Sequence, residues 1–196
     1  MKNKFTQAGF TLIETMVAIS LLSIAIVAPM TLTAQSLASA YYARDQITAF
    51  YLAQEAIEAL RSIRDAQILQ ITHSSNASSI NIFGSIPVNN QPFTVDARQG
   101  DPSAAITLCS GGPCPPLQTN GTLYGYGFCS DGSCNTNFTR TVNAHFIKNA
   151  DGSDDQDEVR ITVTVTWQEG SIVTPRSFSI SENLYRWVND GSSIAS

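Results

Sequence analysis

The sequence predicts an α+β protein in which a long N-terminal helix, first hydrophobic and then amphipathic, packs on an antiparallel β-sheet. Between Phe10 and Ile71 the only helix breaker is Pro29, and no glycine follows Gly9 in this stretch. Near the other end, "EVRITVTVTW" alternates strictly between apolar and polar residues, as a half-buried strand does. The length of 196 residues suffices for one moderate domain plus an additional element.

The first half of the predicted helix is apolar enough to cross a membrane. Residues 15–43 contain no charged side chain, and a bilayer needs only about 20 such residues. Lys2 and Lys4 precede this run, so the positive-inside rule places the N-terminus in the cytoplasm. We therefore expect a single pass through the cytoplasmic (inner) membrane, with the remainder of the chain outside the cytoplasm.

The second half of the helix is predicted to be amphipathic. Its apolar residues recur at steps of three and four, which places them on one helical face. This face, expected to pack against the sheet, comprises Ile47, Phe50, Ala53, Ile57, Leu60 and Ile63.

The sheet is expected mainly from three C-terminal segments that form an antiparallel meander with one buried face. These segments are "FTRTVNAHFIK", "EVRITVTVTW" and "RSFSISENLYRW". Residues 80–118 are rich in Asn, Pro, Gly and Ser, and we expect loops with short strands there, such as "QPFTVDAR".

Glu14 stands inside the apolar run and needs either a partner or a task. An isolated carboxylate in a membrane helix costs on the order of 2.5–3.5 kcal/mol. No other side chain in the run can neutralise it, so the partner must come from a neighbouring subunit or from a newly formed N-terminus. A position near the headgroups would also lower this cost before assembly.

The segment "KFTQAGFTLIET" resembles the signature of type IV prepilins, which is a short basic leader followed by Gly and Phe-Thr-Leu-Ile-Glu. The resemblance implies that a prepilin peptidase cuts between Gly9 and Phe10 and methylates the new N-terminus at Phe10. Glu14 then matches the family's fifth-position glutamate, and its carboxylate faces the Phe10 amine of a neighbouring subunit. The implied organisation is a leader at 1–9, a membrane and filament-core helix at 10–43, and a globular pilin domain at 44–190.

A pilin or pseudopilin has other subunits of its kind, the prepilin peptidase and the inner membrane as partners, and ends in an extracellular or periplasmic filament. "FYLAQEAIEALRSIRD" is similar to the helix of minor pilins of the PilV type and of I-type pseudopilins, which favours a minor subunit. The net charge is −5 and no basic patch is present, so we expect no nucleic-acid partner.

Three other functions were weighed against the filament subunit. A plain single-span anchor accounts for the hydrophobicity but not for Glu14 or the Gly9–Phe10 junction. A membrane-anchored or filament-tip binding module, such as an adhesin, stays open. No constellation of nucleophile, base and acid supports an enzyme, and we expect none, with no obligatory cofactor.

The four cysteines form two Cys-x4-Cys loops, "CSGGPC" and "CSDGSC". In a compartment outside the cytoplasm such clusters form disulfides, and the spacing favours Cys109–Cys114 and Cys129–Cys134. The nested pairing of Cys109 with Cys134 and Cys114 with Cys129 is an alternative. A zinc site of four cysteines is another, although zinc prefers Cys-x2-Cys and a reducing compartment.

A weak candidate for calcium binding lies in "DGSDDQDE". Asp151, Ser153, Asp155 and Asp157 alternate there, as do the oxygen ligands of a calcium loop. The expected glycine at the sixth position is Gln156, and the twelfth position is Thr162 instead of Glu. A solvated hairpin whose charges oppose edge pairing is the simpler interpretation.

Overall fold

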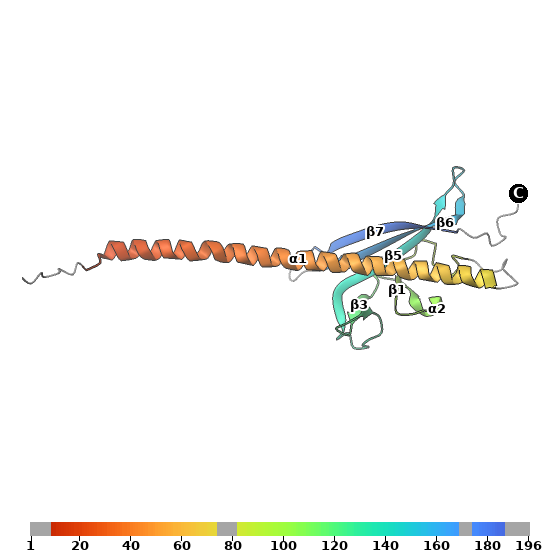
Figure 1. Cartoon of the computed structure of the whole chain (residues 1–196), viewed down its shortest axis with the longest axis horizontal. Helices are drawn as coiled ribbons and strands as arrows, with labels where there is room; N and C mark the ends of the chain where they lie inside the picture. Colours follow the sequence, from red (N-terminus) through yellow and green to blue (C-terminus); the bar gives the residue numbers. More distant parts are fainter. Residues whose placement is uncertain (1–8, 74–81, 169–173, 187–196) are drawn as a thin grey trace, which may run out of the picture. The chain divides into compact units, whose positions relative to one another are not determined.

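The computed structural model describes residues 9–73, 82–168 and 174–186. The chain divides into two compact units, Met1–Asp45 and Gln46–Ser196. Helix α1 (Leu12–His73) is 62 residues long and belongs to both units (Figure 1). The predicted α+β class, with a long N-terminal helix followed by an antiparallel sheet, is confirmed.

The sheet of the second unit has seven strands, and every pairing is antiparallel. Strand β5 is its centre, because β6 pairs along one edge while β1 and β3 pair along the other. β7 then pairs with β6, which completes the predicted meander (Figure 1). The elements after α1 are β1 (Phe93–Val95), α2 (Pro102–Ala105), β2 (Ile106–Leu108), β3 (Pro116–Thr119), β4 (Tyr124–Gly125), β5 (Asn135–Lys148), β6 (Asp154–Trp167) and β7 (Arg176–Tyr185).

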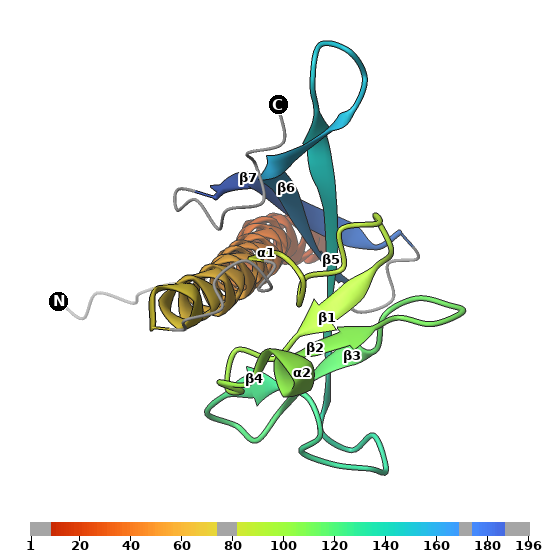
Figure 2. The same ribbon diagram turned by 90° about the vertical axis from the view of Figure 1, so that its right-hand side faces the viewer.

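The core of this unit lies between the second half of α1 and one face of β5, β6 and β7. Figure 2 shows α1 running along one side of these strands. The inward residues Val142, Ile161, Val163 and Val165 are fully buried, as is Leu60 of the helix. Burying one such aliphatic side chain contributes about 1.5–3 kcal/mol, so this interface accounts for much of the stability of the unit.

The predicted helical face was wrong at its beginning. Ala53, Ile57 and Leu60 are buried as expected, but Ile47 is 57% exposed and Phe50 is 36% exposed. Each step of three residues turns the direction of the side chain back by about 60°, so a series dominated by such steps drifts around the helix. The buried stripe begins instead at Ala49 and continues through Leu52, Ala53 and Ala56.

Arg140 ties the helix to two strands from inside the core. It stands on the inward face of β5, and its side chain is only 1% exposed. One terminal nitrogen donates to the Leu52 carbonyl and to the Glu55 carboxylate, both at 2.8 Å, and the other donates to the Val95 carbonyl at 2.6 Å. These bonds offset the desolvation of the guanidinium and join α1, β1 and β5 at one point.

A second charged pair holds the loop after β1. Arg98 donates from Nε and Nη2 to the two oxygens of Asp96, and its guanidinium lies 4.1 Å from the centre of the Phe128 ring. Gly125 is required beside it, since a Cβ there would lie 2.3 Å from the Arg98 Nε. Burial alone would raise the pKa of Asp96, but the hydrogen bonds from Arg98 and from the Tyr126 amide outweigh burial and lower it.

We predict that Arg140→Ala destabilises the globular unit strongly. The substitution removes three hydrogen bonds and leaves two buried carbonyls without a partner, so the free energy of unfolding should fall by about 3 kcal/mol. Urea unfolding followed by tryptophan fluorescence measures it, because Trp167 is buried. Arg160→Ala, on the exposed face of β6, is the matched control and should cost less than about 1 kcal/mol. Equal losses for the two variants would contradict the assigned role of Arg140.

We also predict an acid-sensitive contribution from Asp96. Its folded-state pKa lies below its unfolded value of about 3.9, so the stabilisation is present above that pH and is lost as the pH falls through the folded pKa. Asp96→Asn should therefore lower the free energy of unfolding at neutral pH and flatten its decline below about pH 4. Denaturant unfolding at a series of pH values measures the slope, and an unchanged acid slope would refute the prediction.

Candidate functional site

The candidate site is the start of helix α1, around the residues that the prepilin resemblance singles out. Gly9, Phe10 and Glu14 are all exposed, and Phe10 retains 80% of its accessible surface. Residues 1–8, which hold most of the predicted leader, lie outside the described part of the chain. The geometry of the site is therefore that of the segment from Gly9 onward.

Thr11 caps the helix, a role that the sequence interpretation did not assign to it. The Glu14 amide donates to the Thr11 hydroxyl at 3.4 Å, and the Thr15 amide donates to the Thr11 carbonyl at 3.2 Å. Thr-x-x-Glu is the sequence pattern of a capping box, which was the signal for this cap. Glu14 lies in the first turn, where the partial positive charge of the helix N-terminus favours a carboxylate.

The first half of α1 satisfies its own polar groups. The hydroxyls of Thr15 and Ser20 donate to the carbonyls of Leu12 and Val17, each at 2.8 Å. Ser23 and Thr33 donate in the same way to carbonyls three or four residues earlier. In a medium without water such internal bonds are required, so these hydroxyls are compatible with lipid or with packed helices.

This half of the helix is apolar on every side. Its best 18-residue window has a mean hydropathy of 2.1, and none of that window is buried within the chain. Large side chains such as Leu12, Ile19, Ile24 and Leu32 keep more than 60% of their surface exposed. An amphipathic helix shows one apolar stripe, whereas a helix that is apolar all round belongs inside a membrane or a bundle.

The cysteines are brought together in two local pairs. Cys109 and Cys114 are bonded with their Cα atoms 5.0 Å apart, and Cys129 and Cys134 are bonded at 5.7 Å. Gln118 of β3 holds the second loop, because its side chain accepts from the Cys129 amide and donates to the Cys129 carbonyl. The nested pairing and the four-cysteine zinc site are not the arrangements that the structure adopts.

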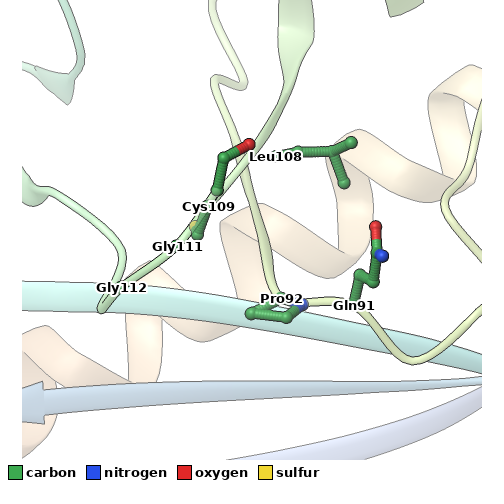
Figure 3. Close-up of a pocket in the computed structure, with 7 residues that line it drawn as sticks. Gln91, Pro92, Leu108, Cys109, Gly111 and Gly112 are labelled. Carbon is green, nitrogen blue, oxygen red and sulfur yellow. The ribbon is translucent and has the colours of Figure 1, made fainter.

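A pocket lies beside the first of these loops (Figure 3). Its lining contains Gln91, Pro92, Leu108 and the loop residues 109–112. Cys109 is bonded to Cys114, so the lining offers Ser110 without a general base beside it. Such a lining gives no basis for acid–base or nucleophilic catalysis.

The calcium candidate falls in the hairpin between β5 and β6. Asp151 accepts from the amide and hydroxyl of Ser153, and these bonds lower its pKa. Asp155 accepts from the amide of Asp157, which itself pairs with Arg186. Among the described residues, no group of three or more His, Cys, Asp or Glu side chains could hold a metal ion.

Comparison with known families supports one class of protein. A family model described as "Prokaryotic N-terminal methylation motif" matches residues 4–28, which include Gly9, Phe10 and Glu14. Together with a long helix followed by an antiparallel sheet, this match supports a type IV pilin-like protein and favours a structural subunit over an enzyme. Searches of curated proteins and of solved structures give no match.

We predict two local disulfides in the mature protein. Thiols are first blocked with iodoacetamide, and chymotrypsin then cuts after Leu123, Tyr124 and Tyr126, which separates the two loops. Non-reducing mass spectrometry should show Cys109 with Cys114 in one peptide set and Cys129 with Cys134 in another. A disulfide-linked peptide that joins the two sets, or alkylated cysteines, would disprove the local pairing.

Proposed function

We propose that the protein is a structural subunit, of the minor kind, in a type IV pilus or a related pseudopilus. The prepilin peptidase cuts after Gly9 and methylates the amine of Phe10, and the subunit waits in the inner membrane before it joins the filament. The observation that carries this proposal is the combination of the matched motif with a helix whose apolar first half has no partner within its own described chain.

The apolar helix supplies the cohesion of the filament. The membrane accommodates this surface before assembly, and the same surface packs against neighbouring helices afterwards. Exchange of lipid for apolar side chains changes little hydrophobic energy, so transfer between the two environments is feasible. This property suits a subunit that is stored in a membrane and later extracted from it.

Glu14 fixes the register between subunits in this proposal. Its carboxylate is exposed, and the described residues of its own chain offer it no salt bridge. Leader cleavage creates a cationic amine at Phe10, and a neighbour that brings this amine to Glu14 neutralises both charges in an apolar environment. A subunit one helical turn out of register would leave both charges unpaired, which is strongly unfavourable.

A minor role is favoured by the second half of the helix. The segment from Phe50 to Asp65 is similar to that of PilV-type minor pilins and I-type pseudopilins. A filament-tip binding module is compatible with this role, since a minor subunit can both assemble and display its globular unit.

We predict that Glu14→Gln separates processing from assembly. The variant keeps the shape and the capping position of the side chain but cannot neutralise the amine of a neighbour. Leader removal and methylation at Phe10, measured by mass spectrometry of the N-terminal peptide, should be unchanged. The amount of the subunit in sheared filaments should fall by about tenfold, the equivalent of 1.4 kcal/mol.

Ser20→Ala is the matched control on the same helix. Ser20 bonds only within its own helix, so the variant should be processed and incorporated normally. Wild-type incorporation of Glu14→Gln would refute the register role. A mature N-terminus other than methylated Phe10 would overturn the assignment to this class of filament subunit.

A further inference from the structure

The outer face of the sheet, opposite α1, carries a regular array of hydroxyl groups. The outward residues of β5, β6 and β7 stand beside one another in register, with one residue from each strand in every row. We call this surface the hydroxyl face; its rows are Thr139–Thr166–Ser177, Thr141–Thr164–Ser179 and Asn143–Thr162–Ser181.

The hydroxyl face is accessible from solvent. The serines of β7 are exposed and the threonines of β6 are half-buried, as expected for flat neighbouring strands. Figure 2 shows α1 on the other side of these strands. Strand geometry sets a spacing of about 4.8 Å between strands and about 6.8 Å between successive rows. The face is therefore a flat lattice of polar groups.

Hydroxyls on this face are joined in pairs but keep bonding capacity. The Thr162 and Ser181 hydroxyls lie 2.9 Å apart, and those of Thr164 and Ser179 lie 3.1 Å apart. A hydroxyl has one donor and two acceptor positions, so each member of a pair can still bond to an outside group. The pairing also fixes the side chains, which lowers the entropy lost on binding.

One end of the hydroxyl face adds an aromatic ring and an amide. Asn183 accepts from the Arg160 guanidinium at 3.0 Å and donates to the Glu158 carboxylate at 2.6 Å. Tyr185 stands opposite Glu158 in the register and is 53% exposed. An exposed ring beside a fixed polar network offers an apolar surface bordered by hydrogen-bonding groups.

The chemistry of the face identifies its ligand class. Its three rows contain no charged side chain, although the chain as a whole has a net charge of −5. A polyanion or an anionic membrane requires clustered Lys and Arg, and a protein interface requires buried apolar anchors. Groups that both donate and accept, arranged along a flat strip with a ring at one end, match an uncharged chain of sugars.

We propose that the hydroxyl face binds a neutral polysaccharide. Hydroxyls of successive sugar units would bond to the rows, and the ring of Tyr185 would lie against the apolar face of one unit. This inference goes beyond the structural role, because it gives the globular unit a ligand of its own. The binding surface is separate from Glu14 and from the apolar first half of α1.

Retention on insoluble polysaccharide tests the proposal. The full chain, solubilised in detergent, is incubated with microcrystalline cellulose and with chitin, and the fraction retained after washing is measured. We expect retention on at least one of the two. Thr164→Glu places a carboxylate at the centre of the lattice and should lower retention at least about fivefold, and Tyr185→Ala should lower it by a similar factor.

Thr122→Glu is the matched control, since it adds the same charge at an exposed threonine in the loop between β3 and β4. It should be retained like the wild type. Ser179→Lys, on the exposed strand β7, repeats the test with the opposite charge if Thr164→Glu disturbs folding, which tryptophan fluorescence reports. Glu14→Gln should also be retained normally, so a failure of the filament proposal is distinguishable from a failure of this one.

Three results would overturn the proposal. The first is the absence of wild-type retention on both polysaccharides, and the second is equal retention of the wild type, Thr164→Glu, Ser179→Lys and Thr122→Glu. The third is loss of co-purifying filament subunits from Thr164→Glu with unchanged retention, which would make the face an interface between subunits.

Discussion

A helix that is apolar on every side cannot remain in water, and this constraint governs the protein. The first half of α1 exposes leucine, isoleucine and valine around its whole circumference, and its hydroxyls bond back to its own carbonyls. It therefore needs an apolar environment that its own chain does not supply. Glu14 is the one group there that such an environment penalises, and it stands beside the junction at which cleavage would create a positive charge.

The second half of the same helix meets the requirement internally. Its small residues Ala49, Ala53 and Ala56 let the helix approach the sheet closely, and the inward valines of β5 and β6 cover them. Arg140 then connects this helix to β1 and β5 through bonds that neither half of the structure could make alone. One helix thus combines a segment that needs outside partners with a segment that anchors a folded unit.

The periodic parts of this structure were predictable from sequence, and the tertiary contacts were not. The long helix and strands β5, β6 and β7 follow from apolar spacing, and Glu14 follows from the cost of a charge in lipid. Strands β1 to β4 are two to four residues long, too short for a periodic signal, and long-range contacts such as those of Gln118 and Asp96 hold the loops between them. Arg140 had a usable signal, because alternation in "FTRTVNAHF" places it on the same face as Phe138 and Val142.

The same alternation links the core to the outer surface. Side chains of a strand alternate between two faces, so the register that buries Val163 and Val165 against α1 also fixes Thr162, Thr164 and Thr166 on the opposite side. A slip of one residue would expose the valines and bury the hydroxyls, and the loss of apolar burial opposes it. The hydroxyl face is therefore held in place by the core beneath it. Its lattice is as rigid as the packing of α1 on the sheet, and it is independent of whatever surrounds the apolar half of that helix.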